Sequence, residues 1–282
     1  MSIIAGQGDA AVSMALLWAR SGDTEGGEGG RTAPGPKPAL SVDAVVAAAI
    51  EVADAETMAG LSMRTVAERL GRSSMALYTY VPGKAELLDL MYDRVHAELS
   101  GPPAGDGAGE DWRAAVTVWA GELRALCLRH PWVLQVSYAR PVLGPHEQAV
   151  LESLLGALDG AGLPPRTLRA VVSSLFHYVR GSARTAAESG RAATATGVSD
   201  AEWWAGRSAL LAEFAPDFAA RFPRSVRLAA ESSSPREGGG SGTAWEREQD
   251  DVFAEGLAVL LDGVEAAAQR HRATGAPAAP AR

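Results

Sequence analysis

The stretch LSMRTVAERLGRSSMALYTYVPGK, residues Leu61–Lys84, decides the fold of the N-terminal half of the chain. Its first segment has apolar residues at helical spacing, a serine at Ser62 that can cap the N-terminus, and Gly71 to end it in the left-handed conformation. Ser73 can cap a second short segment, which Pro82-Gly83 then terminates. The pattern predicts two short helices joined by a glycine turn.

This arrangement is the helix-turn-helix, in which the second helix enters the major groove of DNA and the first braces it. Over Leu61–Lys84 the charge is opposite in sign to that of the whole chain, which carries −8. The segment has four cations and a single anion, giving a net +3, and they are Arg64, Arg69, Arg72, Lys84 and Glu68. A local positive charge is what contact with phosphates requires.

The simpler interpretation is an ordinary helical hairpin whose charges are only solvated. That interpretation leaves unexplained why Met75, Tyr78 and Thr79 fall on the face opposite the inward-facing Leu77. Polar and aromatic side chains on an outer face favour a surface that binds a partner.

Composition sets the class of the whole chain. Of the 282 residues, 47% are hydrophobic and 21% charged, which is ordinary globular composition, and the 6% of aromatic residues favours helices over sheets. We therefore expect an all-α protein. The single cysteine, Cys127, excludes an internal disulfide, and neither a membrane span nor a signal peptide is evident, so we expect a cytoplasmic protein.

Glycine- and proline-rich segments divide the chain into an expected order of parts. Residues 1–39 should be a mostly disordered extension or an arm that contacts DNA, with a short helix near Trp18. Residues 40–100 form the helix-turn-helix domain, which includes helices from Ser41 to about Ala55 and from Lys84 to Leu99. A linker follows, and residues 111–272 form a larger helical domain that contains a flexible loop at 231–244; residues 273–282 are a disordered tail. Helices in the larger domain are expected at 111–129, 145–161, 164–188, from Ser199 or Asp200 onward, and at 245–271, with a short piece from Pro131.

The run from Leu40 to Leu99 resembles the DNA-binding domain of the tetracycline-repressor (TetR) family of bacterial transcription regulators. The resemblance rests on the small-residue-Leu-Tyr core, a following aromatic residue and a lysine that opens the next helix, which are Ala76, Leu77, Tyr78, Tyr80 and Lys84. The rest of the chain resembles the regulatory domain of the tetracycline-type branch in helix order and length. The resemblance implies a homodimer that binds double-stranded operator DNA with palindromic sequence and is released by a small molecule.

Carried over by position, the resemblance implies that Arg64 reaches a base or a phosphate. The residues that would face base edges are Ser73, Ser74, Met75 and Ala76, and those that would hold phosphates are Tyr78, Thr79, Tyr80 and Lys84. Small hydroxyls and a methionine cannot form the bidentate pairs that read guanine or adenine, so we expect Arg64 to supply the strongest direct readout. Arg31 and Lys37 are either a minor-groove arm or solvated linker charges.

Aromatic residues after Asp111 suggest a site for a large, flat, mostly apolar ligand, although each of them alone fits an ordinary core. The expected ligand-binding residues are Trp119, Trp132, Tyr138, His146, Phe176, His177, Arg180, Trp203 and Trp204. His146 and His177 could instead bind a metal, but two isolated histidines are a weak signal, and we expect neither metal nor cofactor.

The helices at 164–188 and 245–271 are the expected dimer surface, because two such hairpins can pair into a four-helix bundle. The helix at 84–99 would connect the reading helices to the ligand site. One alternative is a DNA-binding regulator whose C-terminal domain only dimerises or binds a protein partner. An enzyme is disfavoured, because no Ser/His/Asp ordering, paired metal ligands or phosphate loop stands out.

Overall fold

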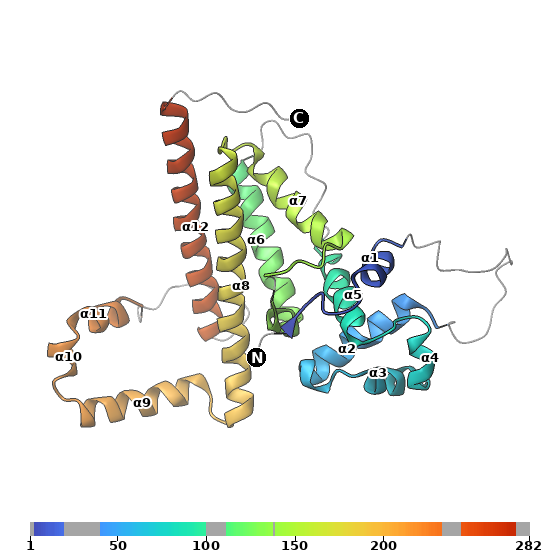
Figure 1. Cartoon of the computed structure of the whole chain (residues 1–282). Helices are drawn as coiled ribbons and strands as arrows, with labels where there is room; N and C mark the ends of the chain where they lie inside the picture. Colours follow the sequence, from blue (N-terminus) through green and yellow to red (C-terminus); the bar gives the residue numbers. More distant parts are fainter. Residues whose placement is uncertain (1–2, 20–39, 100–110, 138, 233–243, 275–282) are drawn as a thin grey trace. The chain divides into compact units, whose positions relative to one another are not determined.

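The computed structural model describes residues 3–19, 40–99, 111–137, 139–232 and 244–274. Helices dominate these residues, and the one sheet among them is a single pair of two-residue strands. The chain divides into two compact units, Met1–Arg184 with Val259–Arg282 and Thr185–Ala258. The expectation of an all-α protein is confirmed (Figure 1).

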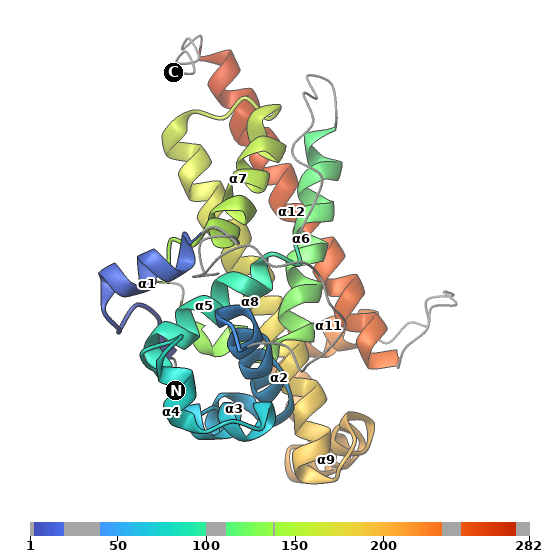
Figure 2. The same ribbon diagram turned by 90° about the vertical axis from the view of Figure 1, so that its right-hand side faces the viewer.

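Four helices follow the predicted order in the first unit: α2 (Val42–Gly60), α3 (Met63–Leu70), α4 (Ser74–Tyr78) and α5 (Lys84–His96). The Ser62 side chain caps α3 in a reciprocal capping box with Thr65, and Gly71 ends α3 with a φ of 63°. α3 packs on both α2 and α4 (Figures 1 and 2). Leu77, the residue of α4 that faces inward, is fully buried and fixes the second helix against the first.

α2 extends past the expected end near Ala55, to Gly60. Its last turn follows a break at Thr57, which has a positive φ of 62°. The break places Met58 and Leu61 in the core, at 4% and 1% exposure, and so accounts for the extra turn.

The N-terminal extension contains the short helix expected near Trp18, which is α1 (Ala10–Leu17), and its N-terminus is capped by Asp9. A short strand that the sequence did not indicate, β1 (Ile3–Ile4), precedes it. α1 packs on α5. Two residues are too short a strand to give a recognisable pattern in the sequence, which is why β1 was not predicted. Residues 20–39, with Arg31 and Lys37, lie outside the described residues.

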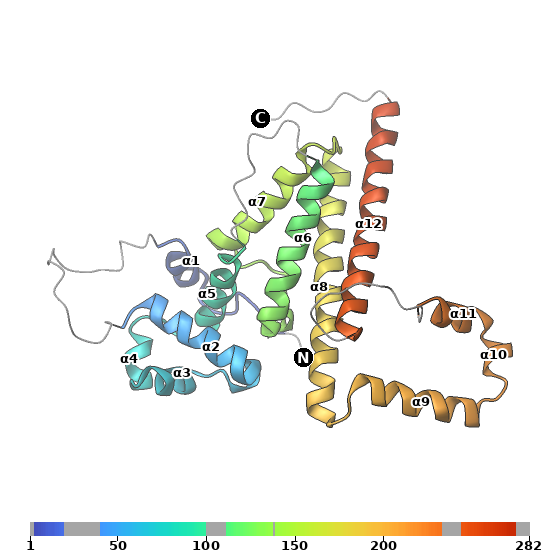
Figure 3. The same ribbon diagram turned by 180° about the vertical axis from the view of Figure 1, so that it is seen from behind.

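The C-terminal part of the first unit begins after the expected linker, which also lies outside the described residues. It contains α6 (Trp112–Arg129), the 3-10 helix η1 (Pro131–Gln135), β2 (Val136–Ser137), α7 (Pro145–Asp159), the first part of α8 (Pro165–Thr196) and the last part of α12 (Ala244–Ala273). α6 packs on α7, with α8 beside them (Figure 3). The helices expected from Asp111, Pro131 and Pro145 are therefore confirmed, whereas α8 runs eight residues beyond the expected Glu188.

The second unit contains the end of α8, α9 (Asp200–Phe214), α10 (Phe218–Arg221), α11 (Pro223–Ser232) and the start of α12. Ser199 caps α9 as expected, through a capping box with Glu202. The sequence did not predict α10 or α11. The expected loop at 231–244 falls mostly outside the described residues, although α11 continues to Ser232 and α12 begins at Ala244.

α5 buries ionisable side chains. His96 is 5% exposed and packs its ring against Tyr92, with the ring centroids 4.6 Å apart. Its Nδ1 lies 2.6 Å from the Tyr92 carbonyl oxygen. Burial lowers the pKa of His96 to about 4, because a charged imidazolium would lose its hydration there.

We predict that His96 makes stability fall in acid. Between its unfolded pKa of about 6.5 and its folded pKa, the unfolded chain binds a proton that the folded protein does not, so stability is lost as pH decreases. From pH 7.5 to 5 the loss should be about 2 kcal/mol. The raised pKa values of buried Asp89 and Asp93 and of half-buried Glu147 act in the opposite direction. Urea unfolding of wild type and His96→Phe at both pH values isolates the histidine, and parallel pH dependence of the two proteins would contradict the prediction.

Candidate nucleic-acid interface and effector site

The expected DNA-reading residues lie on the outer side of α3, α4 and the turns beside them. The Arg64 side chain is 83% exposed and Met75 is 76% exposed. Ser73, Tyr78, Thr79 and Lys84 are also exposed, and Ser74, Ala76 and Tyr80 are half-buried. The structure therefore presents one outward-facing surface in which long polar side chains are few.

The exposed Arg64 side chain forms an ion pair within α3. Its Nε donates to Glu68 Oε1 one helical turn later, at 2.8 Å. Arg69, on the same helix, pairs with Glu51 of α2 at 2.8 Å. Exposed pairs of this kind are worth less than about 1 kcal/mol, so a phosphate or a guanine can compete for Arg64.

Lys84 has a structural contact that the sequence did not indicate. Its Nζ donates to the carbonyl oxygen of Leu61 at 2.6 Å, which ties the start of α5 to the end of α2. An ammonium group has three N–H donors, so this bond leaves donors for a phosphate.

The expected ligand-binding residues separate into several groups. Trp119 and Phe176 form an edge-to-face pair with centroids 5.0 Å apart, and the Trp119 indole donates to the Val150 carbonyl oxygen at 3.2 Å. His177 is exposed on α8, with Nδ1 2.6 Å from the Ser173 carbonyl oxygen. Tyr138 lies outside the described residues.

Trp203 and Trp204 belong to the second unit. Their rings are perpendicular with centroids 4.9 Å apart, and they are 47% and 53% exposed. Arg207 lies over the Trp203 ring, at 5.4 Å from its centroid.

Arg180 lies at a polar centre between α8, α5 and the η1–β2 segment. Its guanidinium donates to the carbonyl oxygens of Val133 at 3.2 Å and Val136 at 2.8 Å. It also lies beside Tyr92 of α5, where burial raises the pKa of the tyrosine to about 12 against the opposing effect of the Arg180 charge. A predicted ligand-orienting residue is thus placed against the helix that leads to the reading surface.

His146 joins the same region through the start of α7. The backbone N–H groups of His146 and Glu147 donate to Asp93 Oδ1 of α5, at 3.0 and 2.8 Å. Burial raises the pKa of Asp93, although these bonds and the His146 charge lower it. Tyr92, Asp93 and Glu147 are residues of this centre that the sequence did not indicate.

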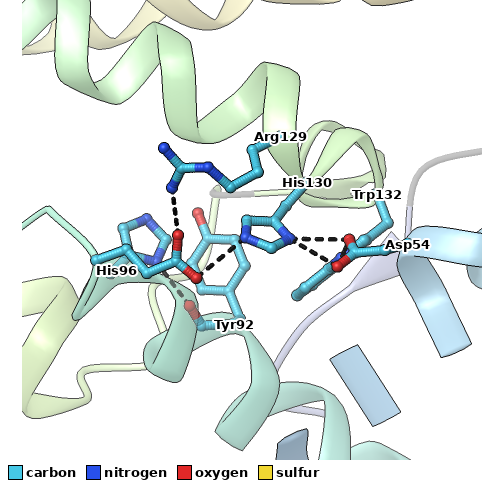
Figure 4. A network of polar contacts seen from close by, with 7 residues as sticks. Asp54, Tyr92, His96, Arg129, His130 and Trp132 are labelled. Atoms are coloured by element: carbon cyan, nitrogen blue, oxygen red, sulfur yellow. Dashed lines mark hydrogen bonds and ion pairs between the residues drawn. The ribbon is translucent and has the colours of Figure 1, made fainter. Parts of the chain in front are cut away.

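A second polar network, which the sequence also did not indicate, joins α2 and the end of α5 to the α6–η1 corner (Figure 4). His130 Nδ1 lies 2.8 Å from Asp54 Oδ1, and its Nε2 lies 3.1 Å from Glu98 Oε1. The Trp132 indole donates to Asp54 at 2.9 Å, and Arg129 pairs with Glu98. A neutral imidazole has one N–H group and can donate a hydrogen bond to only one of the two carboxylates. The doubly protonated ring has two N–H groups and can donate to both.

Trp132, one of the expected ligand-binding residues, is 1% exposed and belongs to this network through its bond to Asp54. We call the network the domain joint; its members are Asp54, Glu98, Arg129, His130 and Trp132. No local sequence signal could identify it, because Asp54 lies 76 and 78 residues before its partners.

Comparison with known proteins decides the family. The family model described as "Tetracyclin repressor-like, C-terminal domain" matches residues 104–268. A protein named HTH-type transcriptional repressor DrrR1, from Streptomyces coeruleorubidus, is 40% identical over 273 residues, which cover 96% of this chain and 92% of that protein. This chain belongs to the TetR family. As a TetR-family protein it is a DNA-binding transcription regulator and not an enzyme.

Solved TetR-family structures share the architecture. Apo ActR from Streptomyces coelicolor is 25% identical with a TM-score of 0.65, covering 84% of this chain and 100% of that chain. ActR from the same organism in complex with (S)-DNPA is 26% identical with a TM-score of 0.61, covering 82% and 100%. These likenesses confirm the N-terminal helix-turn-helix followed by a larger helical domain.

Two further observations concern the part of the chain that the structure describes. None of the helices there is long and apolar enough to cross a membrane. No group of three or more His, Cys, Asp or Glu side chains within those residues is arranged to hold a metal ion.

We predict that the domain joint stabilises this TetR-family fold. Asp54→Asn replaces the carboxylate that is hydrogen-bonded to His130 and Trp132 with a neutral amide. The free energy of unfolding should therefore fall by about 1–2 kcal/mol. The matched control is Glu51→Gln on the same helix, whose exposed pair with Arg69 should contribute less than about 1 kcal/mol. Chemical denaturation measures both variants, and equal losses would show that the joint is no stronger than a surface pair.

Proposed function

We propose that this TetR-family protein is a homodimeric repressor that binds a palindromic operator and is released by a mostly apolar small molecule. The main support for release by a ligand is the position of Arg180. Its side chain lies beside Tyr92 of α5 and also donates hydrogen bonds to carbonyl oxygens of η1 and β2. A ligand that engages Arg180 would change the surroundings of α5, and α5 holds the reading helices through Lys84 and its packing on α2.

We propose dimerisation through α8 and α12, within residues 164–188 and 245–271, and the residues that α12 leaves exposed support it. In the first unit α12 buries Leu261, Val264 and Ala268, but Val259 is 63% exposed and Gly263 faces open space. An apolar residue and a glycine on a free helix face allow close approach of another helix. A two-fold dimer would place two copies of α4 on half-sites of a palindrome.

The operator is proposed to be read mainly by Arg64, with Met75 or Ala76 against a thymine methyl group. Tyr78, Thr79, Tyr80 and Lys84 are proposed to hold phosphates. A DNA-contacting arm at Arg31 and Lys37 remains part of the proposal, with solvated linker charges as the alternative. Because its target is DNA, we propose that the protein acts in the cytoplasm.

The effector site is proposed to include Trp119, Phe176, His146 and Arg180, which combine apolar rings with two groups able to orient a ligand. Relatives support the function: DrrR1 is named as a repressor, and ActR has been solved with (S)-DNPA. The competing function is a regulator whose C-terminal domain only dimerises or binds a protein, with no small-molecule effector.

We predict that an effector weakens operator binding at least tenfold, which corresponds to about 1.4 kcal/mol of differential affinity for the released state. The test is a mobility-shift titration of the full-length protein on a duplex selected by the protein itself, with (S)-DNPA and a panel of flat apolar compounds. Arg180→Lys keeps the charge but loses the planar fork, so its response should weaken, whereas Arg169→Lys on the exposed side of α8 should respond as wild type. Unchanged binding with every compound would favour the regulator without an effector.

We predict that Arg64 carries sequence discrimination. Arg64→Ala should reduce the difference in binding free energy between the selected operator and single-base variants of it by about 1–3 kcal/mol at one position of each half-site. The control is Arg69→Ala, from the same helix, whose side chain pairs with Glu51 and should leave this discrimination unchanged. Fluorescence anisotropy at fixed salt measures both variants. Discrimination that Arg64→Ala leaves intact would assign Arg64 to a phosphate.

A further inference from the structure

The ordered N-terminal segment, Ile3–Trp18, which we call the strap, contacts the C-terminal domain at both of its ends. β1 pairs in parallel with β2, with Ile3 opposite Val136 and Ile4 opposite Ser137. At the other end the Trp18 indole N–H donates to the carbonyl oxygen of Leu143 at 3.0 Å. Between these two attachments α1 packs on α5, so the strap crosses the last helix of the DNA-binding domain.

The middle of the strap is held by two carboxylates of α5. Asp89 accepts from the Gly6 backbone N–H at 2.8 Å through one oxygen, and from the Ser13 hydroxyl at 3.0 Å through the other. Glu86, one turn earlier on the same face, accepts from the Asp9 backbone N–H at 2.9 Å. The strap backbone lies directly on α5, since a Cβ at Gly8 would collide with the Glu86 carboxylate.

The two carboxylates that make these contacts are buried when the strap is docked. Asp89 is 1% exposed and Glu86 is 7% exposed, and within the described residues both hydrogen bonds to Asp89 come from the strap. A buried carboxylate requires such partners, because it has lost its hydration. Asp89 is therefore a receptor for the strap and not an ordinary surface acid.

The strand that receives the strap also belongs to the polar centre. The Val136 carbonyl oxygen accepts from Arg180, and Arg180 lies beside Tyr92 of α5. α5 is thus attached to the C-terminal domain by the strap, and separately by Asp93 at the start of α7.

We propose that the strap is a docking device that fixes α5, and with it α3 and α4, relative to the C-terminal domain, and that its docking raises operator affinity. A fixed reading helix loses less freedom when it binds DNA, which strengthens binding without any new contact to DNA. Undocking of the strap lowers operator affinity. This inference rests on the proposed operator binding but not on the proposed effector.

The test removes residues 2–18 and keeps residues 19–39, so that Arg31 and Lys37 stay in place. Operator affinity of the deleted protein should fall threefold to tenfold, and α5 amides around 86–93 should exchange hydrogen faster than in wild type. The salt dependence of binding should keep its slope, because the strap neutralises no phosphate. Loss of a DNA-contacting arm would instead reduce that slope.

A double-mutant cycle with Asp89→Ala provides the control. If Asp89 acts by holding the strap, Asp89→Ala should reproduce the loss in the full-length protein and have no further effect in the deleted protein. Ser13→Ala, which removes one hydroxyl at a buried position, provides a mild variant should the deletion impair folding, and its affinity should fall by a smaller factor in the same direction. Circular dichroism checks that each variant is folded.

Affinity within twofold of wild type in the deleted protein, or an equal effect of Asp89→Ala with and without the strap, overturns the proposal. A higher affinity after deletion also overturns it. Every comparison uses a duplex that the wild-type protein binds, so these results leave operator binding intact. If the wild-type protein selects no duplex, the proposed repressor itself fails.

Discussion

The need to satisfy the buried ionisable groups of α5 constrains the rest of the first unit. Ten of the thirteen residues of α5 are buried. Four of these ten have ionisable side chains that need hydrogen-bond partners: Glu86, Asp89, Asp93 and His96. A helix that is covered on nearly all sides must supply or receive hydrogen bonds for each such group. The strap, the start of α7 and the Tyr92 carbonyl group meet these requirements. The positions of α1 and α7 therefore follow from the side chains of α5 and not only from apolar packing.

Elements whose signals are local could be predicted from the sequence. Serine caps at Ser41, Ser62 and Ser199 and the glycine at Gly71 mark helix ends within a few residues, and the structure confirms them. The docking of the strap could not be predicted in this way, because its partners lie between 76 and 133 residues further along the chain. A short apolar segment is ordered only when such a distant surface covers it.

The DNA-reading surface could be predicted from local sequence, whereas the surroundings of the expected ligand-binding residues could not. Placing Leu77 in the core automatically turns Met75 and Tyr78 outward, so the exposure of the reading surface follows from helical periodicity. The role of a tryptophan follows from no such rule. Trp132 has an indole that needs an acceptor, and Asp54 of another domain supplies it, which composition alone could not indicate.

The proposed release by a ligand sets a requirement on the strength of the contacts around α5. A hundredfold change in operator affinity corresponds to about 2.7 kcal/mol, and hydrogen bonds to charged groups contribute about 1.5–3 kcal/mol each. In the proposed ligand-responsive repressor, two or three such bonds, among those of Asp89, Asp93 and Arg180, would therefore be enough to separate two positions of α5 in free energy. A weaker set would allow α5 to move without a ligand, and a much stronger set would exceed the differential binding energy that a small molecule can supply.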